Sequence, residues 1–340
     1  MQTTSPVRLL GKVLLLTFPG LLVVAAYFWC DPFVVLYHYD RYPDNLITFP
    51  NRDFISTQTY LNTYRQRPYQ SFILGSSRSL AYRVRDWTPY LPPGPDTLAF
   101  HYDASNESLF GVWKKLEFLE QHGSGPRNVL LVCDYQLLRV TTNLDVEHKR
   151  KDPRLVGESM LAFQATFLRD YLSNGFFWKY FKRRLTGRFT PDMTGVLEPT
   201  HIRYDPRTND MLLPELDAQL RTDSAGYYAR SRQLGPRPAR PEVAPAVIGA
   251  AQLAQLRAIR AIFQRQHTSY QLLINPLYEQ RAFNPADLAQ LQQLFGAGRI
   301  HDFSGVNEFT RETGNYYDYS HYRPKVARQL LRRVYGPVRR

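Results

Sequence analysis

The sequence predicts an α/β fold with three layers, in which helices cover both faces of a parallel sheet. Short apolar runs alternate with helical patterns over most of the chain after residue 69. The run NVLLVCDY at 128–135 is continuously apolar, as expected of a strand that is covered on both faces. The run YQSFILG at 69–75 ends in glycine, which is typical of a buried strand that turns directly into the next element.

The other elements follow from the same patterns. Further strands are expected at 97–102, 270–276 and 299–305, and helices at 105–121, 247–267, 285–295 and 324–335. Ser105 is expected to cap the first of these helices, and Pro285 stands in the first turn of the third. We therefore predict one α/β domain over 69–340, interrupted at about 141–245 by a long insertion with short helices.

The first 30 residues are predicted to form a single transmembrane helix. Residues 13–30 carry no charge, and Arg8 and Lys12 precede them, so the N-terminus is expected in the cytoplasm and the main domain outside. A cleaved signal peptide is the competing interpretation, but the bulky YFWCD stands where a peptidase requires small residues. We expect a single-pass protein of the cytoplasmic membrane with an extracytoplasmic, periplasmic domain, joined to its anchor by a connector at 31–68.

The chain is basic and rich in aromatic residues. Lys and Arg number 43 against 30 Asp and Glu, a formal net charge of +13, which suits nucleic acids, membrane surfaces or anionic polymers. A main domain outside the cytoplasm argues against nucleic acid as a partner. Nucleic-acid binding would require residues 9–29 to be a core helix instead of a membrane anchor. The segment FFWKYFKRRLTGRF at 176–189 is either a surface for a membrane or polymer, or an amphipathic helix whose aromatic side chains pack into the core.

Two distant segments carry the candidate chemistry. LGSSRS at 74–79 follows a strand, and ligands of parallel sheets bind at the carboxyl ends of strands. Ser77 there is either a helix cap or a nucleophile, and a nucleophilic serine needs a base and a group that orients the base. YYDYSHYRP at 316–324 supplies both, because Asp318 and His321 are three residues apart between the last strand and the last helix. We therefore expect a Ser–His–Asp site.

These two segments together resemble the SGNH (GDSL-type) hydrolase superfamily over about 69–335, with the insertion outside the similarity. The resemblance implies a flavodoxin-like domain in which Ser77 is the nucleophile, His321 the general base and Asp318 its orienting partner. The membrane-anchored, exported branch, which includes proteins similar to DltD and to the AlgX/AlgJ-type acetyltransferases, is the most similar. That branch implies acyl transfer on a cell-envelope glycan or anionic polymer through an acyl-serine, with a membrane-bound O-acyltransferase as the source of the acyl group.

The two other blocks of that family differ in this chain. The second block normally offers a glycine N–H to the oxyanion, whereas HYDASNES stands here, so the Ala104 N–H or the Asn106 side chain would replace it. The third block normally offers an asparagine, and this chain has Asp134. Arg78 is equally consistent with binding an anionic substrate and with a salt bridge, and Tyr278 is expected to line the site.

These departures motivate an alternative hypothesis. The chain would then be a catalytically inactive SGNH-like scaffold, or a glycan-binding subunit of an envelope acylation or export complex. The histidines show no metal-ligand spacing, so the sequence predicts no metal site, and it indicates no cofactor.

Overall fold

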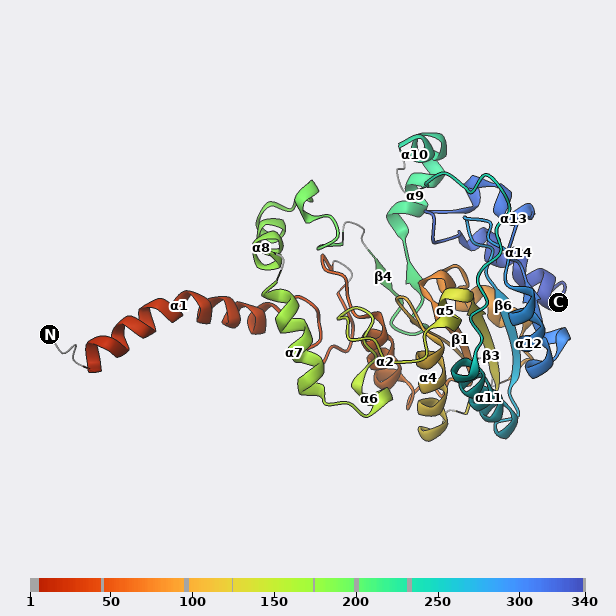
Figure 1. Cartoon of the computed structure of the whole chain (residues 1–340), viewed down its shortest axis with the longest axis horizontal. Helices are drawn as coiled ribbons and strands as arrows, with labels where there is room; N and C mark the ends of the chain where they lie inside the picture. Colours follow the sequence, from red (N-terminus) through yellow and green to blue (C-terminus); the bar gives the residue numbers. More distant parts are fainter. Residues whose placement is uncertain are drawn as a thin grey trace.

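The centre of the chain is a five-stranded, wholly parallel sheet with the strand order β2-β1-β3-β6-β7 (Figure 1). The structure, a computed structural model, describes residues 6–43, 46–94, 98–123, 125–173, 175–198, 202–230 and 234–338. The strands are β1 (Ser71–Ser76), β2 (Ala99–Ala104), β3 (Asn128–Cys133), β6 (Ser269–Ile274) and β7 (Ile300–Asp302). Taken in chain order these strands lie 2-1-3-4-5, the order of flavodoxin-like sheets. The predicted α/β class with a parallel sheet is confirmed.

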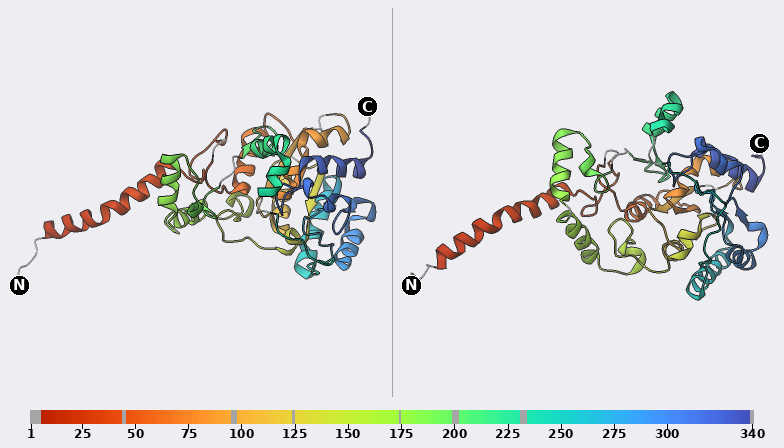
Figure 2. Two further views of the ribbon diagram at one scale, coloured as in Figure 1. Left: turned by 90° about the horizontal axis from the view of Figure 1, so that it is seen from above. Right: turned by 45° about the horizontal axis from the view of Figure 1, so that its top comes forward.

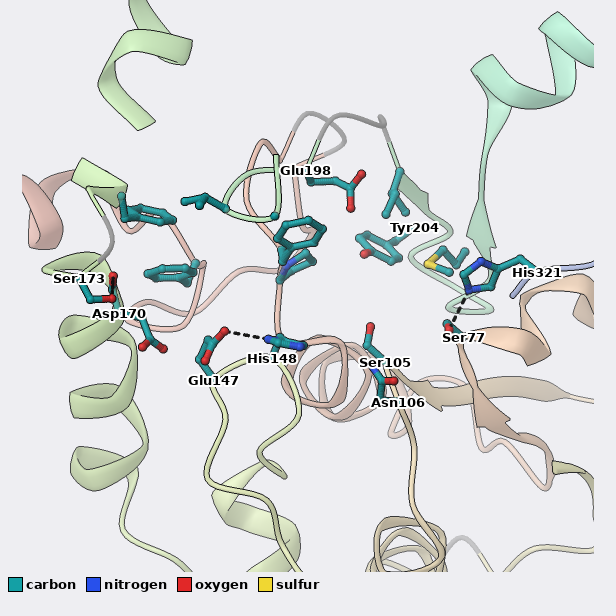
Figure 3. Close-up of a pocket in the computed structure, with 18 of the residues that line it drawn as sticks. Ser77, Ser105, Asn106, Glu147, His148, Asp170, Ser173, Glu198, Tyr204 and His321 are labelled. Carbon is teal, nitrogen blue, oxygen red and sulfur yellow. Dashed lines mark hydrogen bonds and ion pairs between the residues drawn. The ribbon is translucent and has the colours of Figure 1, made fainter. Parts of the chain in front are cut away.

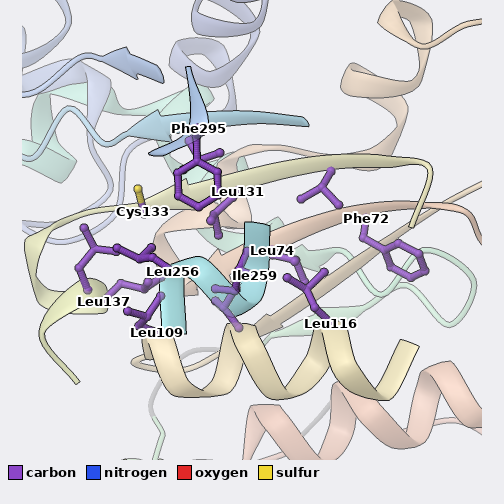
Figure 4. Packing of buried hydrophobic residues seen from close by; sticks show 14 of the residues in the cluster. Phe72, Leu74, Leu109, Leu116, Leu131, Cys133, Leu137, Leu256, Ile259 and Phe295 are labelled. Atoms are coloured by element: carbon purple, nitrogen blue, oxygen red, sulfur yellow. The ribbon is translucent and has the colours of Figure 1, made fainter. Parts of the chain in front are cut away.

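Helices cover both faces of the sheet because successive strand side chains point to opposite sides. Phe72 and Leu74 of β1 point into the larger cluster (Figure 4), whereas Ile73 between them points into the cluster on the other face. The first face is covered by α2 (Arg52–Thr63), α4 (Leu109–Gln121), α11 (Ala250–Arg265) and α12 (Pro285–Phe295). The second is covered by η1 (Ser77–Ala81), α3 (Val84–Trp87), α13 (Glu308–Arg311) and α14 (Pro324–Tyr335).

The first predicted helix begins later than its sequence suggests. Ser108 rather than Ser105 caps it, accepting a hydrogen bond from the Gly111 N–H at 3.0 Å. Residues 105–107 form a loop instead, because Asn106 has a left-handed backbone with φ of 49° that a helix does not allow. The carboxyl end of β2 is therefore followed by an exposed turn, which becomes important for the site below.

The segment 31–68 contains a buried helix that sequence reasoning missed. Asn51 caps α2 by accepting from the Phe54 N–H at 2.8 Å, and Arg52, wholly buried, binds Asp103 of β2 at 2.7 Å. The first turn of α2 is polar, yet it lies inside the protein. Apolar periodicity could not reveal it, because its partners are buried charges distant in sequence.

The insertion does contain short helices, as predicted, and two antiparallel strands. Its elements are α6 (Pro153–Val156), α7 (Met160–Tyr171), α8 (Phe176–Thr186), η4 (Pro191–Met193), β4 (Arg203–Tyr204), β5 (Met211–Leu212), α9 (Pro214–Thr222) and α10 (Ser224–Arg230). It is preceded by α5 (Tyr135–Arg139), and the remaining short helices are η2 (Thr88–Tyr90), η5 (Ala297–Arg299) and η6 (Thr313–Asn315). α7 and α8 belong to a separate aromatic cluster with the end of α1, whereas the part around β5 attaches to the sheet edge.

The N-terminal apolar stretch forms one helix, α1 (Pro6–Cys30), which projects from the end of the molecule that α7 and α8 occupy (Figures 1 and 2). Its last turns are anchored: Tyr27 is buried in the aromatic cluster, and the Tyr171 hydroxyl donates to the Val23 carbonyl at 3.1 Å. Within the described ranges, no helix combines the length and the apolar character that crossing a bilayer requires. The predicted transmembrane anchor at 1–30 is thus not supported.

Candidate active site

The turn after β1 places two serines at the carboxyl edge of the sheet. Gly75 permits this turn, since a Cβ at this position would lie 2.7 Å from the Val132 carbonyl oxygen of β3. Ser76 caps the short helix η1 by accepting from the Arg78 N–H at 3.4 Å. Ser77 is the first residue of η1 and its side chain borders a cavity. The strand-to-helix turn predicted from LGSSRS is therefore present.

The three residues predicted to act together form a continuous hydrogen-bond chain (Figure 3 shows its first link). Ser77 Oγ lies 2.9 Å from Nε2 of His321, and Nδ1 of His321 lies 2.9 Å from Oδ2 of Asp318. This is the connectivity in which a base removes the serine proton while the carboxylate holds the opposite ring nitrogen. The loop that carries Asp318 and His321 comes from the far end of the chain, His321 being 244 residues after Ser77.

Asp318 is held in its ionised form. Burial acts to raise the pKa of its carboxyl group, but the hydrogen bond and charge of His321 outweigh burial and lower that pKa below its ordinary value. The N–H groups of Ser320 and His321 assist by donating to Oδ1 at 2.7 and 2.9 Å. The carboxylate can therefore accept the Nδ1–H of His321, which leaves Nε2 free to accept the proton of Ser77.

The loop with Asp318 and His321 is closed at its base by two tyrosines. Tyr316 and Tyr322 form a β-bridge with one another. The Tyr316 hydroxyl donates to the Pro276 carbonyl at 2.8 Å, and the Tyr322 hydroxyl donates to Oδ1 of Asn275 at 2.6 Å. The loop is thus fastened to the end of β6, so its position is set by the sheet.

The insertion fastens the same loop from the other side. The Tyr227 hydroxyl of α10 donates to the Tyr317 carbonyl, and the Tyr228 hydroxyl donates to the Tyr316 carbonyl at 2.7 Å. The Tyr317 hydroxyl in turn donates to Oδ1 of Asp217 on α9. The insertion thus helps to hold the loop of Asp318 and His321.

Ser77 and His321 open into a cavity of about 640 Å³ between the sheet edge and the helices α7 and α8 (Figure 3). It is lined by Phe33, Phe49, Pro50, Ser77, Ser105, Asn106, Glu147, His148, Asp170, Ser173, Phe176, Gly195, Val196, Glu198, Ile202, Tyr204, Met211, Tyr319 and His321. Within the described part of the chain this lining includes three carboxyl groups and neither a Lys nor an Arg. The cavity is therefore apolar and acidic, although the protein as a whole is basic.

The carboxyl groups distant from Ser77 interact with one another. Nδ1 of His148 lies 2.8 Å from Oε1 of Glu147, and this hydrogen bond lowers the pKa of Glu147 to about 2. Burial, followed by the hydrogen bond and charge of Glu147, raises the pKa of Asp170 to about 6. The negative charge of this part of the cavity accordingly increases as the pH rises through about 6.

Arg78 and Asp134 are bound to each other. Nη1 of Arg78 lies 2.7 Å from Oδ2 of Asp134, and its Nη2 donates to Gln136 at 3.0 Å. Burial acts to lower the pKa of Arg78, but the charge of Asp134 raises it above its ordinary value. Asp134 also caps α5, accepting from the Gln136 and Leu137 N–H groups at 2.9 and 3.1 Å. Of the two interpretations of Arg78, the structure has the salt bridge, largely buried, and neither residue lines the cavity.

The other predicted site residues are separated by the fold. Asn106 lines the cavity beside Ser77 and presents its left-handed turn there, whereas Ala104 is the last residue of β2, in register with Ser76. Tyr278 is buried against the ring of Tyr316, with centroids 5.2 Å apart, and is absent from the cavity lining. It therefore supports the loop of Asp318 and His321 and does not line this cavity.

The loop that carries Asn106 is fixed from beneath by buried charges. Glu107 receives Nζ of Lys115 at 2.6 Å and Nζ of Lys151 at 2.5 Å, and all three side chains are buried. Lys115 also lies 2.9 Å from Asp53 of α2. Burial acts to lower the pKa of Lys115, but the charges of Asp53 and Glu107 raise it. Lys151 belongs to the insertion, so the insertion supports this side of the site as well.

A second Ser–His–Asp chain, which sequence reasoning missed, lies behind Ser77. Ser79 Oγ donates to the Ser76 carbonyl at 2.7 Å and lies 2.8 Å from Nε2 of His101. Nδ1 of His101 lies 3.3 Å from Oδ1 of Asp210. All of these side chains are buried, so this chain does not meet a ligand but holds the turn of Ser77. Nothing in the sequence marked Asp210, within the insertion, as a partner of His101.

In the described ranges, no three side chains among His, Cys, Asp and Glu are grouped so that they could hold a metal ion.

No model of a known protein family matches this chain, and no curated protein sequence matches it.

Proposed function

We propose that this chain is an SGNH-type serine esterase or O-acyltransferase that forms an acyl-serine intermediate at Ser77. The observation that carries the proposal is the chain from Ser77 Oγ through His321 to Asp318, with consecutive contacts of 2.9 and 2.9 Å, at the carboxyl edge of the sheet and open to a cavity. Helix capping does not account for Ser77, because Ser76 is the residue that caps η1.

In the proposed reaction the Ser77 oxygen attacks the carbonyl carbon of an acyl ester while its proton moves to Nε2 of His321. The bond to the alkoxy leaving group then breaks, and His321 returns the proton to the departing oxygen. Water or a sugar hydroxyl next attacks the acyl carbon while its proton moves to His321; the bond to Ser77 Oγ then breaks, and His321 returns the proton to Ser77. Asp318 stays ionised throughout and stabilises the imidazolium.

Asn106 is the proposed donor to the oxyanion, because it lines the cavity together with Ser77. Asp134 does not oppose the developing negative charge in this scheme, since Arg78 and two backbone N–H groups occupy its carboxylate. Loss of one oxyanion donor commonly reduces the rate by about 10²–10³. Asn106→Ala is therefore expected to reduce acylation by roughly that factor.

As substrate we propose the acyl groups of a cell-envelope glycan or polymer, with the acyl group supplied by a membrane-bound O-acyltransferase and the main domain outside the cytoplasmic membrane. The acyl ester, rather than the anionic part of such a polymer, would enter the cavity, because the cavity presents carboxyl groups and, within the described residues, neither a Lys nor an Arg.

The test is labelling of the purified full-length chain with a fluorophosphonate, which reacts with activated serines. We expect one adduct, located at Ser77 by peptide mass spectrometry and absent from Ser77→Ala. Ser76→Ala is the matched control, because the neighbouring serine has no contact with His321 and should leave labelling detectable. An adduct that survives Ser77→Ala, or no adduct at all, would favour the inactive scaffold or glycan-binding subunit.

A further inference from the structure

Helix α8 has two apolar sides. Phe176 and Tyr180 are buried in the aromatic cluster with α7 and the end of α1, as expected of an amphipathic helix that packs into a core. Trp178 and Leu185 point the other way, with 74% and 85% of their surfaces exposed. They are seven residues apart and so lie on one side of the helix. Core packing accounts for the first pair and leaves the second unexplained.

Basic residues surround this exposed apolar side of the helix. Phe176–Arg188 contains Lys179, Lys182, Arg183, Arg184 and Arg188 and no acidic residue. Lys182, Arg184 and Arg188 are exposed, and Lys182 has an exposed partner in Asp192 at 3.2 Å. An exposed Trp and Leu bordered by exposed Lys and Arg are typical of helices that lie in the interface of an anionic bilayer.

The position of α8 in the molecule agrees with such a role. α7 and α8 form the end of the body from which α1 projects, as all three views show (Figures 1 and 2). Other large apolar side chains are exposed at this end, among them Leu172 at the end of α7 and Trp29 in the last turn of α1. Apolar exposure is therefore concentrated at one end and shared by three helices.

We propose that the outer face of α8, formed by Trp178, Lys182 and Leu185 and bordered by the exposed Arg184, docks on the surface of a bilayer that contains anionic lipids. Charge favours this occupant, since anionic headgroups complement the basic side chains while the apolar side chains enter the acyl boundary. A second copy of the chain would bring the same positive charge to a symmetric contact. The proposal does not depend on the proposed reaction.

Docking would also place the cavity close to the bilayer. Phe176 on the inner side of α8 lines the cavity that holds Ser77, and so do Asp170 and Ser173 just before the helix. The two sides of a single helix thus serve the cavity and the docking face. A substrate or product carried at the membrane surface would have only this helix layer to pass.

A local probe tests the docking independently of α1, whose own apolar surface could hold the chain on vesicles. The full-length chain with Cys30→Ser and Leu185→Cys is labelled with the fluorophore NBD; the remaining Cys133 is buried and does not react under native conditions. With phosphatidylcholine vesicles that contain phosphatidylglycerol, we expect a blue shift and an intensity increase of about twofold or more. Pure phosphatidylcholine should give a much smaller change.

Two comparisons make the result decisive. The same probe at Val243→Cys, an exposed apolar position on the α/β body, should not respond to vesicles. Lys182→Glu with Arg184→Glu should weaken the response at residue 185 about tenfold or more in a lipid titration, because it reverses two charges at the surface. No response at residue 185, or an equal response at residue 243, overturns the proposal. A response that grows with protein concentration without lipid assigns the face to a second copy and overturns it as well.

Discussion

Ser79 Oγ lies 2.8 Å from Nε2 of His101, in a fully buried contact two residues beyond the proposed nucleophile. The same hydroxyl donates to the carbonyl of Ser76, and Asp210 of the insertion binds the other nitrogen of the imidazole. The turn that aims Ser77 is therefore connected through β2 to the insertion. We infer that Ser79 and His101 are positioning residues, which act on the reaction only through the place of Ser77.

Ser79→Ala should slow fluorophosphonate labelling of Ser77 roughly tenfold, because the turn relaxes when the contacts of the Ser79 hydroxyl with the Ser76 carbonyl and with His101 are lost. The control is Ser71→Ala, at the opposite end of β1, where the buried serine accepts from Nδ2 of Asn128 at 3.0 Å. Both variants should lower the melting temperature similarly, but only Ser79→Ala should slow labelling. Equal labelling rates in the two variants would show that Ser79 has a purely structural role.

Asp318→Asn should reduce the labelling rate by about 10³–10⁴ with little loss of stability. The amide of an asparagine would donate to Nδ1 of His321, so the ring proton would move to Nε2, which then cannot accept the proton of Ser77. The rate of adduct formation measures this, and thermal unfolding checks the fold. A variant that labels at more than a tenth of the wild-type rate would contradict the assignment of Asp318.

The buried pair of Arg52 and Asp103 predicts both a stability and a pH effect. Asp103→Asn leaves Arg52 buried without a counter-charge, so the free energy of unfolding in urea should fall by about 3–5 kcal/mol. The exposed pair of Arg230 and Asp223 is the matched control, and Asp223→Asn should leave the free energy of unfolding almost unchanged, because water screens an exposed pair. Similar losses in the two variants would contradict the argument.

The pH effect has a definite sign. Burial acts to raise the pKa of Asp103, but the charge of Arg52 outweighs it, so this pKa is lower in the folded state than in the unfolded chain. The stabilisation is then fully present above the ordinary carboxyl value of about 4 and is lost as the pH falls below it. Unfolding free energies of the wild type should therefore decrease on acidification in that range, and those of Asp103→Asn should decrease less.

The sheet and the Ser–His–Asp chain could be predicted because their signals are local. An apolar run that ends in glycine and serine marks the end of β1. Asp318 and His321 are three residues apart, so a single loop carries both of them. The topology then unites them, since both segments follow strands whose carboxyl ends meet at one sheet edge. No knowledge of contacts between distant residues was needed.

The supporting contacts could not be predicted because each joins residues that are far apart and individually ordinary. Asp210 meets His101 across 109 positions, and Arg78 meets Asp134 across 56. The second contact pairs the carboxylate of Asp134 with a positive charge, which the sequence alone left open. Tyr278 shows the reverse case: it follows β6, as expected of a lining residue, but turns beneath Tyr316.

Asp170, which lines the cavity, should make the substrate preference depend on pH. Because burial and the neighbouring Glu147 raise the pKa of Asp170 to about 6, the cavity gains a negative charge above that pH. For esters of equal length, the KM of an anionic acyl ester should therefore rise relative to that of a neutral one by roughly threefold between pH 5 and pH 7. Asp170→Asn should remove this pH dependence, whereas Asp145→Asn, an exposed carboxylate outside the cavity lining, should retain it. A KM ratio that stays constant with pH in the wild type, or that still changes in Asp170→Asn, would show that the ester does not reach this end of the cavity.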